Sequence, residues 1–193
     1  DMTLLRTSIT AVWLAFSLSA CVSPPGVPPQ HITSAQQLLK WEAQGKLGVR
    51  TPSTAKAVNF QWQHSPKQLE IKLHGALGLG SARLSRAPNG NFTLQTKDGT
   101  EQAESAESLL YATLGWSLPV AALEYWVKGV PTPEATVESQ TLDNEGKLTH
   151  LQQQGWKLHY PKYGEYGSLS LPKKIIASRD ELRLTIVIHA WRF

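Results

Sequence analysis

Six histidines and one cysteine are the residues of this chain best suited to nucleophilic or metal chemistry. The histidines are at positions 31, 64, 74, 150, 159 and 189, and no two of them have the His-Glu-x-x-His spacing of a zinc protease. A single cysteine offers no cysteine pair for zinc. His150 and His159 are the one pair that a hairpin would bring together, although surface positions explain them as simply. The sequence therefore predicts a protein that is not an enzyme and has no metal site and no cofactor.

A glycine-rich segment, Gly75-Ala76-Leu77-Gly78-Leu79-Gly80, resembles a phosphate-binding loop only on the surface. It lacks the Gly-Lys-Ser/Thr ending of a P-loop, and the residues after it continue as a strand instead of a helix. Its glycines permit a sharp excursion of the chain, and they leave Leu77 and Leu79 without bulky neighbours to cover them. Either the loop folds back and buries both leucines, or it projects as an apolar tip that touches a membrane or a hydrophobic partner.

Cys21 cannot form an internal disulfide because the chain has no second cysteine. The residues before it have the order of an export signal: Arg6, an apolar run over 9–16, and then Leu18-Ser19-Ala20. Cysteine directly after Leu-Ser-Ala resembles the bacterial lipobox, in which this cysteine becomes the lipidated first residue of the mature protein. The alternative is a buried N-terminal helix with an incidental cysteine.

The predicted organisation is a lipoprotein signal peptide over 1–20, a lipid-anchored tether over 21–31 and a folded domain over 32–193. Four prolines in residues 22–29 favour an extended tether. Valine follows Cys21, whereas aspartate at that place typically retains a lipoprotein in the inner membrane. The predicted location is therefore the outer membrane, with the protein anchored by lipid and facing the periplasm.

Composition limits the remaining classes of protein. The chain has 193 residues, of which 41% are hydrophobic and 18% are charged, and these values exclude a disordered chain and a coiled coil. No apolar run is long enough for a stable membrane-spanning helix. The formal net charge of +4 suits acidic partners or anionic headgroups, but there is no basic cluster, so no nucleic-acid partner is expected.

Hydrophobic periodicity predicts strands with a few inserted helices. A helix is expected from Ser34 through Trp41, ended by Gly45, and two more are expected over 105–114 and 117–129. Apolar residues alternate with polar ones over 58–63, 69–73, 92–95, 156–160 and 182–188, a pattern typical of half-buried strands. These elements predict a mainly β fold in which a single curved antiparallel sheet carries helices near one mouth.

Several segments resemble the LolB family, and the resemblance covers nearly the whole chain. The segments are Gln44-Gly45-Lys46-Leu47, Phe60-Gln61-Trp62-Gln63, Ala76-Leu77-Gly78, Tyr125-Trp126-Val127-Lys128-Gly129-Val130-Pro131, Gly155-Trp156-Lys157-Leu158-His159-Tyr160 and Leu171-Pro172. The resemblance implies an unclosed barrel with a helical lid over an apolar cavity. It also implies an outer-membrane receptor that accepts triacylated lipoproteins from the periplasmic carrier LolA and inserts them among outer-membrane lipids. Leu77 matches the family's membrane-insertion leucine, and Leu79 is an added apolar residue.

The expected cavity and lid residues are apolar: Phe60, Trp62, Ile71, Leu73, Leu123, Trp126 and Trp156. Sequence pattern alone does not distinguish a filled interior from an open one. Two alternatives therefore remain beside the lipoprotein receptor, which is expected to be a monomer. One is an envelope-assembly scaffold that binds protein instead of acyl chains, and the other is a lipid-active enzyme that uses His150 and His159.

Overall fold

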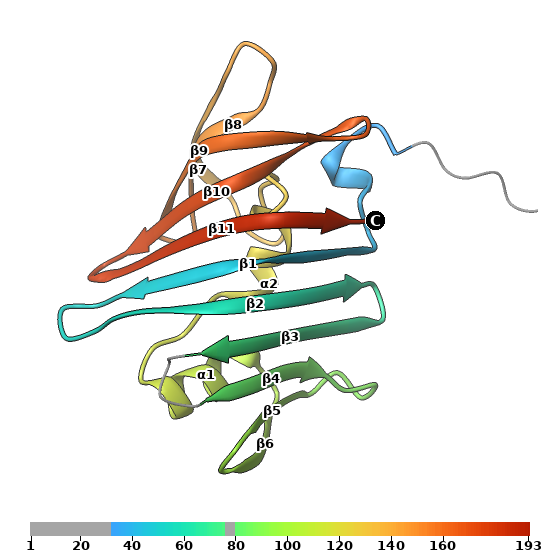
Figure 1. The fold of residues 1–193 in the computed structure, drawn as a ribbon. Helices are drawn as coiled ribbons and strands as arrows, with labels where there is room; N and C mark the ends of the chain where they lie inside the picture. The colour runs from blue at the N-terminus through green and yellow to red at the C-terminus, as the bar shows by residue number, and fades with distance from the viewer. Residues whose placement is uncertain (1–31, 76–79) are drawn as a thin grey trace, which may run out of the picture. The chain divides into compact units, whose positions relative to one another are not determined.

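One open antiparallel sheet makes up most of the protein. The computed structural model describes residues 32–75 and 80–193, so Cys21, Leu77 and Leu79 lie outside the described residues. The sheet has 11 strands in the order β6-β5-β4-β3-β2-β1-β11-β10-β9-β8-β7, and the edge strands β6 and β7 do not pair with each other. Figure 1 shows both α-helices lying against the same face of this sheet. The predicted fold class, a single curved antiparallel sheet that does not close, is confirmed.

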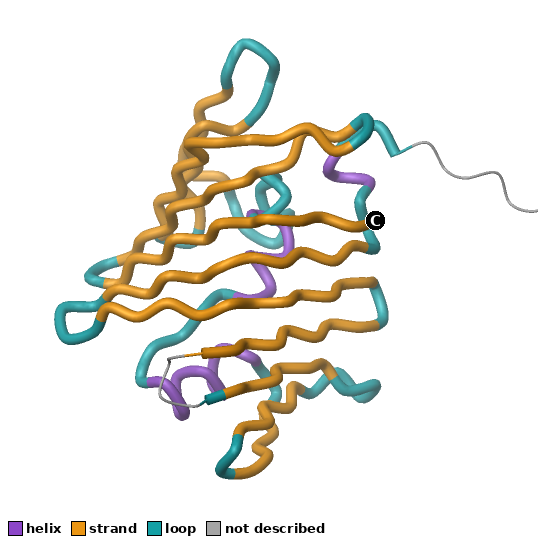
Figure 2. The backbone as a smooth tube through the Cα atoms, viewed as in Figure 1, coloured by secondary structure: helices purple, strands orange, loops and turns teal. Residues whose placement is uncertain are grey.

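The strands follow one another as hairpins, and the α-helices are inserted between β6 and β7, as the tube in Figure 2 shows. The strands are β1 Trp41–Arg50, β2 Ala55–Ser65, β3 Gln68–Gly75, β4 Ser81–Arg86, β5 Phe92–Thr96, β6 Gly99–Ala103, β7 Val137–Leu142, β8 Leu148–Gln153, β9 Trp156–Tyr166, β10 Leu169–Arg179 and β11 Leu182–Arg192. The helices are η1 Ala35–Gln37, α1 Ala106–Leu114 and α2 Val120–Trp126.

Alternating burial along each central strand divides the sheet into an inner and an outer face. In β11, Leu184, Ile186 and Ile188 are buried, while Arg183 and His189 are exposed. The buried positions join residues of α1 and α2 in one hydrophobic core. Because side chains alternate between the two faces of a strand, the period-2 pattern in the sequence determines which residues face the helices.

The predicted helix from Ser34 through Trp41 is wrong. Only the three-residue η1 forms there, Ser34 makes no side-chain cap, and Trp41 begins β1. The Trp41 ring instead packs edge-on against Trp62 and Trp191, with ring centroids 5.1 and 5.4 Å away. Burial of these aromatic rings between neighbouring strands outweighs a weak local helical pattern.

The two other predicted helices are confirmed, with shorter bounds for the second. The Ser105 side chain accepts a hydrogen bond from the backbone N–H of Ser108 at the start of α1, and Gly115 ends that helix with φ +78°. Only Gly and Asn adopt this left-handed conformation readily, so Gly115 fixes where the chain turns. Pro119 precedes α2, as the sequence pattern predicts.

Gly45 lies inside β1 and does not end a helix. The pairing of β1 with β11 shifts register between Gln44 and Gly45, and the two backbones come unusually close there. A Cβ atom at position 45 would overlap the Val187 carbonyl oxygen and would lie 2.9 Å from the Val187 carbonyl carbon. Glycine is therefore required at position 45, because the nearby backbone of Val187 cannot move aside as a side chain could.

We expect Gly45→Ala to lower the free energy of unfolding by about 3 kcal/mol, because β1 and β11 must separate to admit the methyl group. Gly48→Ala is the matched control in the same strand, since its Cβ would meet only Thr185 at 3.7 Å. That substitution should change stability by less than about 1 kcal/mol. Urea unfolding followed by tryptophan fluorescence measures both, and equal stability of the two variants would contradict the close approach.

Candidate functional site

A wholly apolar pocket lies between the inner face of the sheet and the two α-helices. Strands β1 to β5 and β11 supply one wall, and α1, α2 and their connection supply the other. The lining residues are Leu47, Phe60, Trp62, Ile71, Leu73, Leu84, Leu94, Leu110, Leu118, Val120, Leu123, Val127, Leu184 and Ile186. A wall made only of aliphatic and aromatic groups offers no hydrogen-bonding partner, so it favours a hydrocarbon ligand over a polar one.

Five of the predicted cavity residues meet at this pocket, and two do not. Phe60, Trp62, Ile71, Leu73 and Leu123 line it. Two predicted residues, Trp126 and Trp156, are instead fully buried in the neighbouring part of the core, with ring centroids 6.3 Å apart. Sequence pattern placed all seven on the apolar side of their elements, but it did not show which part of the core each of them fills.

In this conformation the pocket is narrow. Its volume is about 60 Å³, whereas pockets that hold small molecules typically measure roughly 300–1,000 Å³. The structure therefore does not show the open cavity that the family resemblance implies, and the helices would have to move to admit a larger ligand.

A second, wider hollow lies beside the hairpin between β1 and β2. It measures about 560 Å³ and is lined by Val49, Lys56, the 51–54 turn and the chain from Thr113 to Trp116. Val49 follows Leu47 on the inner face of β1, and Leu114 follows Leu110 by one helical turn, so residues that line the two spaces are neighbours on the same elements. Polar and apolar groups both line the second hollow, which makes it suitable for a ligand segment that joins hydrocarbon to polar groups.

The C-terminal end of α2 is fixed to the sheet by buried hydrogen bonds around Gln153. The side-chain oxygen of Gln153 accepts from Trp126 Nε1 at 2.9 Å and from the Thr132 N–H at 3.0 Å. Its amide nitrogen donates to the carbonyl oxygens of Thr132 and Ala135 at 2.8 and 2.7 Å. Tyr160 donates its hydroxyl hydrogen to the Trp126 carbonyl at 3.0 Å. Because buried polar groups are costly to leave unpaired, these bonds hold the end of α2 in place.

A second set of contacts holds α2 from its side. The Glu124 carboxylate lies 3.0 Å from His64 Nε2 on β2 and accepts a hydrogen bond from Arg86 at 2.8 Å. The ammonium group of Lys128, four residues later, donates to the Leu38 carbonyl at 3.0 Å. Burial lowers the pKa of Lys128 below its ordinary value. Sequence reasoning missed these residues because 60 positions separate His64 from Glu124 and 38 separate Arg86 from it.

Helix α1 is held differently. Within residues 32–75 and 80–193, no side-chain hydrogen bond or salt bridge joins α1 to the sheet, and Ala106, Leu109 and Leu110 contribute its buried surface. Apolar contacts are not directional, so another hydrocarbon surface can replace them without leaving polar groups unpaired. The covering layer therefore has a fixed part, α2, and a part that can be displaced at lower cost, α1.

His150 and His159 do come together, but away from the pocket. They pair across β8 and β9 with stacked rings 4.6 Å apart, on exposed positions of the outer face. In the part of the chain that the structure describes, no group of three or more His, Cys, Asp or Glu residues could hold a metal ion. This arrangement does not support the alternative of a lipid-active enzyme built on this pair.

Two further features concern membranes. Among the described residues, no helix is both long and apolar enough to cross a bilayer. Leu77 and Leu79 lie outside the described residues, and the two residues that flank their segment are joined by a hydrogen bond that the Gly75 N–H donates to the Gly80 carbonyl at 3.0 Å. Both of these glycines have positive φ, +116° and +73°, which glycine adopts without strain.

We expect Gln153→Ala to lower the free energy of unfolding by about 3 kcal/mol or more, because it leaves Trp126 Nε1 and buried backbone groups near Thr132 unpaired. Gln152→Ala is the matched control, since Gln152 is the neighbouring residue on the outer face of β8. It should change stability by less than about 0.5 kcal/mol. Thermal unfolding of the two variants gives the comparison, and a mild effect of Gln153→Ala would show that α2 is not held here.

Comparison with known proteins shows extensive similarity to one family. A LolB protein of Cellvibrio japonicus, named outer-membrane lipoprotein LolB, is 37% identical over 193 residues, covering 95% of each chain. The protein of that name from Stutzerimonas stutzeri is 33% identical and covers 99% of this chain and 97% of its own length.

A solved structure agrees at the level of the fold. The crystal structure of a DUF1329 family protein from Desulfovibrio piger has a TM-score of 0.52 and 6% sequence identity, and the alignment covers 82% of this chain and 87% of that one. The family described as outer membrane lipoprotein LolB matches residues 39–191, which include both α-helices and all of the strands except the last residue of β11. This chain belongs to the LolB family of outer-membrane lipoproteins.

Proposed function

We propose that this protein takes up the acyl chains of triacylated lipoproteins beneath α1 and α2, receives them from the periplasmic carrier LolA, and releases them into the outer membrane. The observation that carries the proposal is the pocket with an entirely apolar wall under a helical cover. Membership of the LolB family supports the same role. The protein acts as a monomer by binding and transfer, without a chemical step.

The energetics of hydrocarbon explain why such a protein is needed. Burying an acyl chain of about 15 methylenes is worth on the order of 12 kcal/mol, at ~0.8 kcal/mol per methylene. Free passage of a triacylated protein through water is therefore negligible. Transfer proceeds if the pocket binds acyl chains more favourably than the carrier does and the bilayer binds them more favourably still. No nucleotide is required for such a series of downhill steps.

Displacement of α1 provides the room for a ligand. The pocket of about 60 Å³ is too small for an acyl chain, but among the described residues α1 contacts the sheet through apolar side chains and through no side-chain hydrogen bond. An incoming chain replaces those contacts with equivalent ones, so the cost of lifting α1 is largely recovered. The anchored helix α2 keeps its place and preserves the other wall, including Leu123.

The polar end of the cargo fits the hollow beside the β1–β2 hairpin. This hollow is lined by both polar and apolar groups, among them Lys56, Thr113 and Trp116. The Thr113 hydroxyl is buried and has no hydrogen-bond partner among residues 32–75 and 80–193. A carbonyl or amide of the lipidated N-terminus would satisfy such a group while the acyl chains continue into the apolar pocket.

The narrowness of the pocket is the observation that favours a second candidate, an envelope-assembly scaffold lipoprotein that binds protein instead of acyl chains. The two functions differ in one direct measurement. A lipoprotein receptor takes up a fluorescent fatty acyl probe, whereas a scaffold with a permanently filled interior does not. Failure of the full chain to bind such a probe would overturn the proposed function.

We expect Leu73→Asp to weaken binding of the fluorescent acyl probe about tenfold, because it places a carboxylate in the wall of the apolar pocket. Leu73 is only partly buried near the end of β3, so the variant should fold. His74→Asp is the matched control, since the next residue is exposed on the other face of the same strand. Fluorescence titration measures both, and equal affinities would place the acyl chain elsewhere.

Leu77 and Leu79 are proposed to act in the insertion step and not in uptake. We expect Leu77→Ser and Leu79→Ser, made separately and together, to leave acyl-probe binding unchanged and to slow cargo delivery into vesicles several-fold. The larger single effect identifies the dominant leucine. Leu142→Ser, an exposed leucine on β7, is the control. Unchanged delivery by the double variant would remove the loop from the mechanism.

A further inference from the structure

The outer face of the sheet carries two parallel rows of cations. In the first row, Arg50 pairs with Arg183, which pairs with Ser178, which pairs with Lys157. Residues paired directly across antiparallel strands point to the same face. Register therefore gathers on one surface charges that lie far apart in the sequence.

The second row also carries three cations and runs across the same strands. Lys46 pairs with Val187, Val187 with Lys174, and Lys174 with Lys162. We call the surface formed by these two rows the basic face; its cations are Lys46, Arg50, Lys157, Lys162, Lys174 and Arg183.

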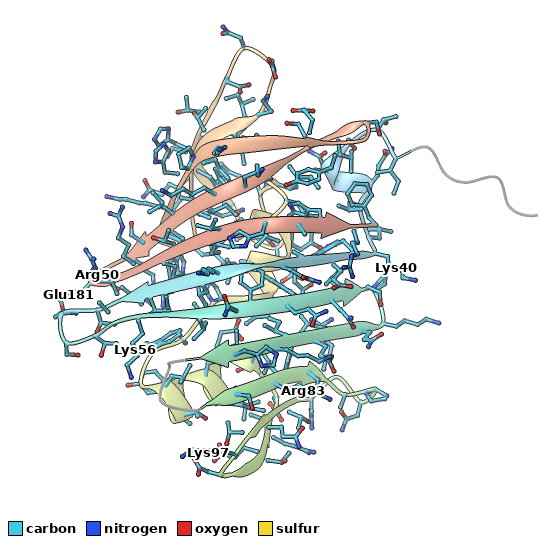
Figure 3. The ribbon with its side chains drawn as sticks, in the orientation of Figure 1. Lys40, Arg50, Lys56, Arg83, Lys97 and Glu181 are labelled. Carbon is cyan, nitrogen blue, oxygen red and sulfur yellow. The ribbon has the colours of Figure 1, made fainter. Side chains whose placement is uncertain are left out.

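Carboxylates are absent from these rows. Within the described residues, none of the six cations makes a salt bridge. Three acidic residues of the same outer face, Glu42, Glu70 and Glu165, lie toward the opposite strand ends, where they contact Gln61, Lys72 and Ser170. Glu181 belongs to the turn between β10 and β11, beyond the first row, where Figure 3 shows it near Arg50.

This concentration of like charge is unfavourable for the protein alone. Arg50 lies directly opposite Arg183, and Lys174 lies directly opposite Lys162. Like charges at directly opposed positions destabilise a sheet, and the two rows place six cations and no carboxylate on one surface, where the cations repel one another. An anionic partner relieves the repulsion on contact, so the arrangement is typical of a surface that is covered in use.

A shallow hollow on the basic face is suited to a phosphate group. Its floor is formed by small residues, among them Gly48 and Ala57, and its sides include Arg50, Lys56 and Arg183. Figure 3 shows Arg50 and Lys56 at the same end of their strands. Guanidinium groups bind phosphate oxygens in a two-pronged geometry, and the absence of bulky side chains lets a headgroup approach the backbone.

We propose that the basic face lies against the anionic phospholipid headgroups of the membrane. The breadth of the basic face favours a membrane over a compact ligand. Its cations span β1, β11, β10 and β9, and neighbouring strands in a sheet are about 4.8 Å apart. A bilayer presents anionic groups over an extended plane, and clusters of Lys and Arg bind such surfaces additively. The inference rests on the proposed function, because a lipid anchor is what keeps the domain beside a membrane.

This contact orients the protein. The basic face is opposite the face covered by α1 and α2 (Figure 1), so docking turns both helices away from the headgroups and toward an arriving carrier. The hollow beside the β1–β2 hairpin includes Lys56, which also borders the hollow on the basic face. The open end of the acyl path then lies at the edge of the membrane contact.

Amine footprinting of the full, lipid-anchored chain tests the proposal without any substitution. The protein is reconstituted in vesicles of phosphatidylcholine alone or with about 30% phosphatidylglycerol, modified with an amine-reactive reagent and analysed by mass spectrometry. We expect Lys46, Lys157 and Lys174 to react about fivefold more slowly in the anionic vesicles, and high salt to abolish the difference. Lys67 and Lys97, in turns away from the basic face, serve as internal controls.

Charge reversal supplies the matched variants. Lys46→Glu with Lys174→Glu should abolish the protection of Lys157, whereas Lys67→Glu with Lys97→Glu, which changes net charge equally, should preserve it. Thermal unfolding confirms that both variants fold. Equal reactivity of the basic face in both vesicle types, or protection only when an acidic protein is added, would overturn the proposal. Acyl-probe binding is measured on the same samples, so loss of membrane contact is distinguishable from failure of the proposed function.

Discussion

The inner face of an unclosed, curved sheet is apolar and must be covered, and this constraint governs the rest of the structure. A closed barrel fills its own interior with side chains, but here β6 and β7 do not pair, so α1 and α2 cover part of the inner face. A cover that buried this surface permanently would leave no space for a ligand. A cover that stayed open would expose a large apolar area to water. The narrow pocket of about 60 Å³ is the outcome: it is nearly full, and within the part of the chain that the structure describes no side-chain hydrogen bond joins α1, one of its walls, to the sheet.

The unequal attachment of the two helices follows from the chemistry of their contacts. Hydrogen bonds to Gln153 and the contacts of Glu124 with His64 and Arg86 are directional, and breaking them leaves buried polar groups without partners. Leu109 and Leu110 of α1 lose little if another hydrocarbon takes the place of the sheet. A hydrocarbon ligand can therefore replace the contacts of α1 at little cost in free energy. It cannot replace the contacts of α2 without leaving buried polar groups unpaired. This difference restricts movement to one side of the cover and keeps the opposite wall of the pocket intact.

Most of the sheet could be predicted from the sequence, because alternation such as Val58, Phe60 and Trp62 reports local geometry. The error at Trp41 arose where a local helical pattern competed with aromatic packing between strands. The polar contacts of α2 could not be predicted, since His64 and Glu124 become neighbours only through the fold. The same limit applies to the pocket: apolar positions were identifiable, but whether Trp126 lines it or lies beside it depends on three-dimensional packing.

The outer face illustrates how register produces properties that composition does not display. The sequence contains no basic cluster, and Lys46 and Lys174 are separated by most of the domain, yet the pairing of β1, β11 and β10 places them in one row. Only long strands in fixed register achieve this, and the buried inner face fixes the register, since a one-residue slip would turn Leu47 outward and Lys46 inward. The apolar pocket and the charged surface are therefore two consequences of the same strand alternation, and neither face can shift without the other.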